Sequence, residues 1–210
     1  LEQRVRKVAE GAALMTETHV EVIFDDACAP LINNHQLADL QYEAMQLVGP
    51  LRFTDEEIAF AKQINDWYPP GTMEEVAKNM LLPRAYYGQH LLGENFPSLD
   101  ENEIYTGSTD VGDLSRVAPV SMLLTACWPA GTPGHTWGVV ATGAMSIGHK
   151  GMMHAAKIMA VSALELYTQP QRLQAVRQEF EQRVLVQPYK SPIPDHIHPP
   201  QYDQQEVNHG

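Results

Sequence analysis

A short apolar run beside a long helical pattern is the feature that most constrains this fold. Residues 119–128 (PVSMLLTACW) carry no charge and are short for a core helix, which favours a buried β-strand. Residues 146–167 repeat apolar side chains at spacings of three and four, the pattern of a helix. Residues 18–24 are rich in β-branched side chains and follow a predicted helix at 1–15. The sequence therefore predicts an α/β fold.

Further helices are predicted from their start signals. Asn33 or Asn34 can cap the first of them, because a short polar side chain can accept a hydrogen bond from the first turn. Thr54 and Glu57 stand in the spacing of a capping box and predict the start of the next. An amphipathic pattern over residues 170–184 predicts the last helix.

Two segments predict little regular structure. Residues 68–103 contain several prolines and glycines and predict a surface excursion with one short helix and an acidic turn at its end. Residues 186–210 hold five prolines, at 188, 192, 194, 199 and 200, and predict an extended tail.

The charge of the chain argues against two classes of partner. The chain contains 14 Lys and Arg residues and 26 Asp and Glu residues, which gives a formal net charge of -12. Such a field repels phosphate backbones and anionic lipid, so we expect neither a nucleic-acid nor a membrane partner. Cys28 and Cys127 are far apart and do not indicate a disulfide framework, so we expect a cytoplasmic location.

A glycine-punctuated loop at residues 107–113 (GSTDVGD) carries the first candidate site residues. Thr109 and Asp110 place a hydroxyl and a carboxylate just ahead of the apolar run. The loop lacks the lysine of a phosphate-binding loop, so it does not indicate a nucleotide site. An alternative is that Asp110 only caps backbone amides in a turn.

His135 is the second candidate, in the loop that follows the apolar run. A neutral imidazole there can bind zinc, although a lone histidine can equally be a packed or capping residue. His149 and His154 lie five residues apart on a predicted helix, about 140° around its axis, and do not form a paired site. We predict that Thr109, Asp110 and His135 line one pocket wall.

Three passages together resemble a known family. They are ALMTETHVEV at residues 13–22, TGSTDVGDLSRVAPV at 106–120 and GTPGHTWGVVATGAMSIGHKGMMHAAKIMA at 131–160. They are similar to amidohydrolases of the zinc aminoacylase and carboxypeptidase superfamily, of the aminobenzoyl-glutamate utilization protein B type. The resemblance covers nearly all of residues 1–185, and the second and third passages are its specific parts.

The resemblance implies a fold and a reaction. It implies that residues 1–27 are a helix–strand remnant of a lid domain that dimerises, that residues 28–185 are the C-terminal half of an α/β catalytic domain, and that 186–210 are a tail. It implies a metal-dependent hydrolase, with zinc or manganese, that cleaves the amide of p-aminobenzoyl-glutamate or a related N-acyl amino acid. By the same resemblance His135 is a metal ligand, and Thr109 and Asp110 contact the substrate.

The sequence also departs from the family pattern. The family's first ligand pair, its bridging carboxylate and its catalytic glutamate have no counterpart in these 210 residues, so no catalytic residue is assigned. The chain begins at Leu1 within a predicted helix, and we expect it to be the C-terminal part of a longer enzyme. We expect this chain alone to hold no tight metal and to be inactive. Two alternatives stay open: a non-catalytic binding or assembly module on the same α/β scaffold, and an enzyme completed by a second chain.

Overall fold

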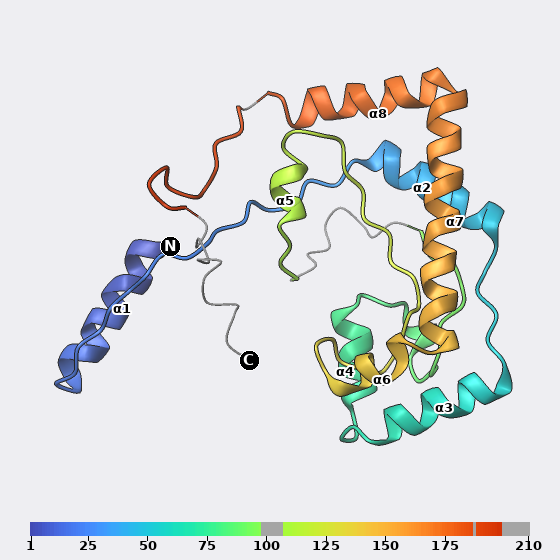
Figure 1. The fold of residues 1–210 in the computed structure, drawn as a ribbon, viewed down its shortest axis with the longest axis horizontal. Coiled ribbons are helices and arrows are strands. Elements are labelled where there is room, and N and C mark those ends of the chain that lie inside the picture. The colour runs from blue at the N-terminus through green and yellow to red at the C-terminus, as the bar shows by residue number, and fades with distance from the viewer. Residues whose placement is uncertain (98–106, 187, 199–210) are drawn as a thin grey trace, which may run out of the picture. The chain divides into compact units, whose positions relative to one another are not determined.

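The computed structural model describes residues 1–97, 107–186 and 188–198. Within these residues the chain consists of helices joined by irregular segments (Figure 1). The elements are α1 (Glu2–Met15), α2 (His35–Val48), α3 (Asp55–Asp66), α4 (Thr72–Asn79), the 3-10 helix η1 (Arg84–Tyr86), α5 (Val111–Leu114), α6 (Trp137–Gly143), α7 (Ser146–Thr168) and α8 (Pro170–Arg183).

The chain divides into two compact units. Leu1–Ala29 and Lys190–Gly210 form the terminal unit, and Pro30–Tyr189 form the central unit. In the terminal unit, Arg6 on α1 pairs with Glu2 at 2.9 Å and donates to the carbonyl oxygen of Val22. No residue of α1 is buried. The assignment of residues 1–27, 28–185 and 186–210 to lid, catalytic domain and tail stays a prediction.

Helix α7 organises the core of the central unit. It packs against α2, α6 and α8 (Figure 1). Ile158, in the middle of α7, is fully buried, and Ile147 near its start is 1% exposed. Ile147 belongs to an apolar cluster that also contains Ala61, Leu91 and the partly buried Phe53 and Phe60. This cluster joins the start of α7 to α3.

The predicted helix starts are confirmed. The side chain of Asn34 accepts a hydrogen bond from the backbone N–H of Leu37 at 2.9 Å, as an N-cap residue does. Both reciprocal hydrogen bonds of the Thr54–Glu57 capping box are present. Gly49 follows α2 with φ of +82°, a conformation that favours glycine and that ends the helix.

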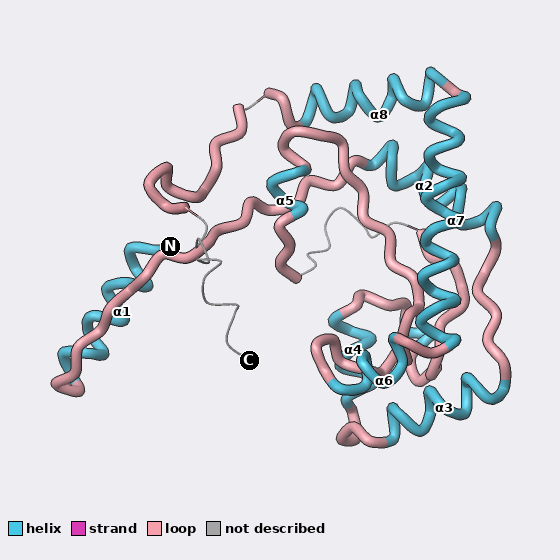
Figure 2. Tube along the Cα trace, in the orientation of Figure 1, coloured by secondary structure: helices cyan, strands magenta, loops and turns pink. Residues whose placement is uncertain are grey.

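The predicted α/β fold is wrong for the described residues. Figure 2 shows helices and loops there and no strand, either in residues 18–24 or in 119–128. Residues 1–27 thus consist of α1 followed by an irregular segment. A strand exists only where a neighbouring strand pairs with its backbone, and within the described part of the chain these two segments have no such neighbour.

The apolar run lies along helix α7 instead. The Thr125 hydroxyl donates to the carbonyl oxygen of Gly151 at 3.1 Å. Gly151 permits this approach, because a Cβ atom there would lie 2.4 Å from the carbonyl oxygen of Ala126. The run is only partly buried, with Met122, Leu124 and Trp128 exposed, so the predicted burial of this segment is not found either.

Parts of two predicted segments lie outside the described residues. These are residues 98–103, with the acidic turn, and residues 187 and 199–210 of the tail. The short helix of the surface excursion is present as α4. Among the helices that the structure describes, none combines the length and the apolarity needed to cross a membrane.

Candidate functional site

His135 lies at the tip of an ordered loop that leads into α6. The predicted turn-rich segment before it is confirmed, with Gly131 and Thr132 buried and His135 exposed. The φ angle of His135 is +58°, in the left-handed region that residues other than glycine seldom occupy. Such a conformation persists only where neighbouring contacts hold the backbone, and it is found preferentially at functional sites.

One set of contacts holds the start of this loop against α3. Thr132 is 1% exposed, and its hydroxyl donates to the side-chain oxygen of Asn65 at 3.3 Å. Nδ2 of Asn65 lies 3.1 Å from Nδ1 of His90. The amide can only donate there, so the neutral imidazole of His90 carries its proton on Nε2. The backbone N–H of Ala130 donates to the carbonyl oxygen of His90 at 2.9 Å, which fixes the entry to the loop.

A second set of contacts holds the end of the loop. The Thr136 hydroxyl donates to the carbonyl oxygen of Pro133 at 2.8 Å. The phenol oxygen of Tyr68 lies 2.7 Å from the same hydroxyl, and because that proton is already used, Tyr68 is the donor. Gly138 leaves room for the phenol, since a Cβ atom there would lie 2.5 Å from its oxygen. His135 therefore stands between two anchored positions.

Aromatic rings flank the loop. Trp137 stacks on Tyr68 with ring centroids 5.7 Å apart and an interplanar angle of 18°. Trp67 meets Trp137 edge to face at 6.2 Å and 84°. Trp67 and Trp137 are 78% and 49% exposed. Neither these rings nor the anchors Asn65 and His90 were predicted from the sequence. The only local sequence signal for an aromatic group beside His135 was Trp137, two positions after it.

Thr109 and Asp110 open the short helix α5. The Thr109 hydroxyl accepts a hydrogen bond from the backbone N–H of Val111 at 3.2 Å. Asp110 occupies the N-cap position, is exposed, and makes no side-chain capping hydrogen bond. In Figure 1, α5 lies well away from α6, so the structure brings Thr109 and Asp110 together but does not bring them beside the His135 loop. Their role in substrate binding stays a prediction.

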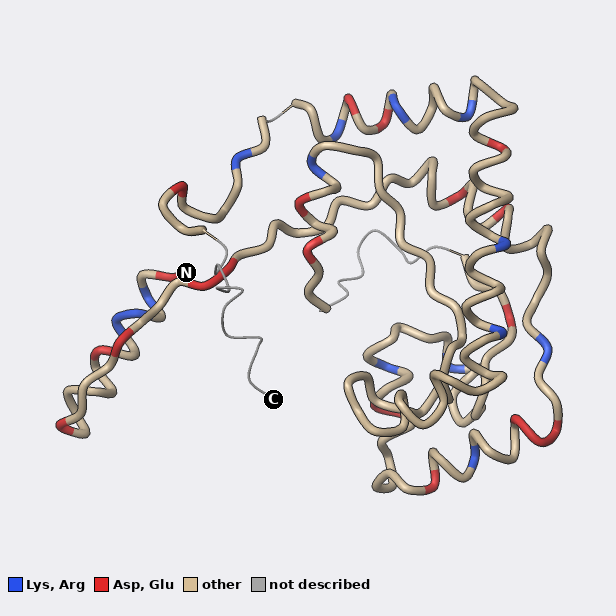
Figure 3. The backbone as a smooth tube through the Cα atoms, viewed as in Figure 1, with Lys and Arg blue, Asp and Glu red and all other residues tan. Residues whose placement is uncertain are grey.

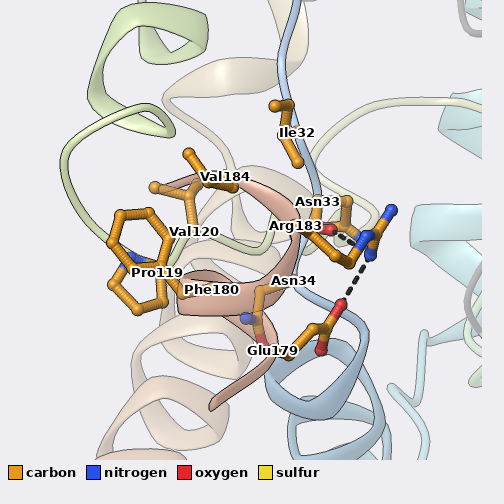
Figure 4. A pocket seen from close by; sticks show the side chains of 9 residues that line it. All are labelled: Ile32, Asn33, Asn34, Pro119, Val120, Glu179, Phe180, Arg183 and Val184. Carbon is orange, nitrogen blue, oxygen red and sulfur yellow. Dashed lines mark hydrogen bonds and ion pairs between the residues drawn. The ribbon is translucent and has the colours of Figure 1, made fainter. Parts of the chain in front are cut away.

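A small pocket joins the start of α2 to the end of α8 (Figure 4). Glu179 fills it, because its carboxylate accepts hydrogen bonds from the backbone N–H groups of His35 at 2.9 Å and Gln36 at 2.8 Å. Arg183 pairs with Glu179 at 2.5 Å and donates to the carbonyl oxygen of Asn33. Burial opposes ionisation of Glu179, but these donors outweigh it and hold its pKa below the ordinary value. These contacts hold the start of α2 against the end of α8, so the role of the pocket is structural.

A buried carboxylate fastens α3 to α7. Glu57 is 8% exposed and accepts hydrogen bonds from the hydroxyl of Ser146 and the ammonium of Lys150, each at 2.6 Å, and from the backbone N–H of Thr54 at 2.7 Å. Burial raises the pKa of Glu57, yet the hydrogen bonds and the charge of Lys150 together lower it below the ordinary value.

The described residues do not by themselves form a metal site. No three His, Cys, Asp or Glu side chains among them lie close enough together to hold an ion. A catalytic zinc takes about three protein ligands, and His135 provides one imidazole. The donor set of the described residues therefore does not fit the implied metal without further ligands.

A known bacterial hydrolase is similar to this chain over nearly all of the chain's length. No family model matches the chain, and no solved structure matches it. The chain is 39% identical over 205 residues to a subunit of p-aminobenzoyl-glutamate hydrolase from Escherichia coli strain K12. The match covers 93% of this chain and 43% of the relative, so the chain spans less than half the relative's length. The resemblance to the aminobenzoyl-glutamate amidohydrolases, first inferred from three passages of the sequence, is thereby confirmed.

Proposed function

We propose that this chain is the part of a p-aminobenzoyl-glutamate hydrolase that presents His135 to the reacting amide. The observation that carries the proposal is the loop around His135. Its histidine is exposed in a left-handed conformation, and both of its ends are anchored to α3 and the nearby Tyr68. Similarity to a protein named as part of a p-aminobenzoyl-glutamate hydrolase supports the choice of reaction.

The chain's own residues contribute position. The hydrogen bonds through Thr132 and Thr136 fix the backbone on either side of His135, so the imidazole is presented from a preorganised loop. Preorganisation matters because a misplacement of about 1 Å can cost roughly 100-fold in rate. We further propose that the complete enzyme is metal-dependent, with zinc or manganese, and that His135 is one of several ligands. No step is assigned to the metal, since the described residues do not complete its site.

The remaining parts of the proposal concern the setting of the chain. We propose that Thr109 and Asp110 contact the substrate and that this chain alone is inactive. We also propose a cytoplasmic enzyme that works as an oligomer, in line with the relative's being named as a subunit. The substrate class is an N-acyl amino acid.

A chimeric enzyme tests the proposal. This chain replaces the matching 43% of the Escherichia coli protein, and release of p-aminobenzoate from p-aminobenzoyl-glutamate is measured. We expect His135→Ala to lower kcat/KM at least about 100-fold, the upper end of the loss seen when a residue that merely orients a metal ligand is removed. Bound zinc and manganese, measured by elemental analysis, should fall with it.

His149→Ala is the matched control. His149 is also an exposed histidine, on α7, and we expect its loss to leave kcat/KM and metal content unchanged. A folded His135→Ala chimera with the activity and metal content of the control would show that His135 has no part in the reaction.

A further inference from the structure

We propose that Trp67, Tyr68 and Trp137 form the subsite that receives the aryl ring of an N-aroyl amino acid substrate. This inference rests on the proposed function, which places His135 at the reacting amide. It adds the residues that would distinguish an aromatic acyl group from an aliphatic one.

The three rings form a platform with an open face, called the aromatic platform below. Trp137 and Tyr68 are nearly parallel, and Trp67 stands almost perpendicular to Trp137. Trp67 exposes 78% of its surface and Trp137 exposes 49%. Aromatic rings attract further rings in stacked or edge-to-face arrangements, and this platform offers a stacked pair with a perpendicular wall.

The platform is rigidly tied to the His135 loop. The phenol of Tyr68 donates to Thr136, which is the residue between His135 and Trp137. Gly138 leaves the space that the phenol fills. A hydrogen bond and a close backbone approach thus fix Tyr68, and the stacked ring of Trp137 with it, relative to the backbone of the loop.

The chemistry of an aroyl amide requires the ring site to lie beside the reacting group. In p-aminobenzoyl-glutamate the ring is bonded directly to the carbonyl carbon of the amide that is cleaved. Two residues span at most about 7 Å of backbone, so the Cα atoms of His135 and Trp137 are no further apart than this. The backbone of the platform residue Trp137 therefore lies within about 7 Å of the backbone of His135.

The charge distribution fits a neutral ring. The chain carries a net charge of -12, yet no Asp, Glu, Lys or Arg occurs between Arg116 and Lys150. Figure 3 accordingly shows α6 without charge along its length. The nearest acid in sequence to Trp67 is Asp66, and Lys62 pairs with it at 2.5 Å. A neutral aryl group can therefore reach the platform without meeting an unpaired charge from this sequence segment.

The first experiment measures binding to this chain without turnover. The chain has three tryptophans, so Trp128→Phe leaves only the two of the platform to fluoresce. We expect p-aminobenzoyl-glutamate to quench this fluorescence beyond its effect on free N-acetyltryptophanamide, and N-acetylglutamate to have no effect. Trp67→Leu in the same background should weaken the apparent affinity about 3- to 10-fold, the range expected from one lost aromatic contact. Absence of specific quenching would overturn the inference.

The second experiment measures selectivity in the chimeric enzyme. We expect Trp67→Leu to raise KM for p-aminobenzoyl-glutamate by the same 3- to 10-fold and to leave kinetics with N-acetylglutamate unchanged. Trp128→Phe is the control, since Trp128 lies outside the platform and should leave both substrates unaffected. Equal effects of Trp67→Leu on both substrates would overturn the inference while the proposed hydrolase function stands.

Failure of the proposed hydrolase function would give a result that differs from failure of the aryl subsite. If the chimera hydrolyses no N-acylglutamate, the proposed function fails, and the binding experiment still decides whether the platform holds an aryl ring. If Trp67→Leu changes the sedimentation coefficient of the chain and not its quenching, the platform is a contact between two copies and the inference is wrong.

Discussion

Removal of one charge, by Glu57→Gln, is expected to destabilise the central unit. Glu57 is 8% exposed and accepts hydrogen bonds from Ser146, Lys150 and the backbone of Thr54. Glutamine keeps one acceptor oxygen but turns an NH2 group toward at least one of these donors. The shape of the side chain is retained, so the variant isolates the loss of charge and of the second acceptor.

The expected cost follows from these contacts. A hydrogen bond to a charged group contributes about 1.5 to 3 kcal/mol. Lys150 is 34% exposed at its side chain and can partly rehydrate once the carboxylate is gone, so we take the lower part of this range. The free energy of unfolding should fall by about 2 kcal/mol. For a chain of this size that lowers Tm by about 4 to 8 °C.

The assay is urea unfolding followed by circular dichroism, with Glu56→Gln as the matched control. Glu56 precedes Glu57 in the same first turn of α3 but is exposed, so both variants change the net charge and the helix terminus alike. We expect the control to lose less than about 0.5 kcal/mol. Equal losses in the two variants at pH 7 would refute the argument that the buried contacts of Glu57 stabilise the unit.

The same pair of variants has a defined dependence on pH. The pKa of Glu57 is lower in the folded chain than its ordinary value, so the folded state binds this proton less readily than the unfolded state. Its stabilisation is then complete above the unfolded-state pKa, about 4.3, and is lost as the pH falls through the lower folded-state pKa. The difference between the wild type and Glu57→Gln should therefore shrink below about pH 4.

Two further variants test other contacts of the central unit. Gly151→Ala should destabilise it by about 1 to 3 kcal/mol in urea, because the new Cβ would lie 2.4 Å from the carbonyl oxygen of Ala126, whereas Gly143→Ala, with nothing within 4 Å, should not. Glu179→Gln should cost about 1 kcal/mol at pH 7 and less at pH 4, since the lowered pKa of Glu179 makes its contribution fade in acid. Glu181→Gln, which removes an exposed ion pair on the same helix, should show neither effect by the same measurements.

The helices could be predicted because their signals are local. Asn34 and the Thr54–Glu57 pair satisfy backbone groups no more than three residues away, so their effect can be read from spacing alone. The long α7 likewise follows from its own periodicity. The prediction of these elements required no knowledge of what they pack against.

The strands were mispredicted because their stability is not local. Residues 119–128 have the composition of a buried strand, and they are extended and lie along α7. Composition indicated a buried segment paired in a sheet, but the segment is only partly buried and packs against a helix, because neither its burial nor its covering element is fixed by the run itself. The glycine at position 151 is what lets the backbone approach the helix so closely, and nothing in the run itself indicates that contact.

The candidate site was predicted only in part, because some of its stabilising contacts are also not local in sequence. The loop and His135 follow from a turn-rich sequence, whereas its anchors Asn65, Tyr68 and His90 lie 45 to 70 residues earlier, on other parts of the chain. Such partners carry no spacing rule relative to the loop. Their contacts with the loop can be identified only from the structure, in which the end of α3 lies beside α6.

This arrangement changes where the geometry of His135 is determined. At the edge of a sheet, strand pairing would set the position of a loop. Here the end of α3 and the nearby Tyr68 set that position, through side-chain hydrogen bonds at both ends of the loop. Tyr68 takes part in both the loop anchor and the aromatic platform, so the position of the loop that carries His135 and the stacking of the Trp137 ring are coupled through one side chain. Changes that move Tyr68 should therefore disturb the proposed reacting group and the proposed aryl subsite together, whereas changes at Trp67 act on the subsite alone.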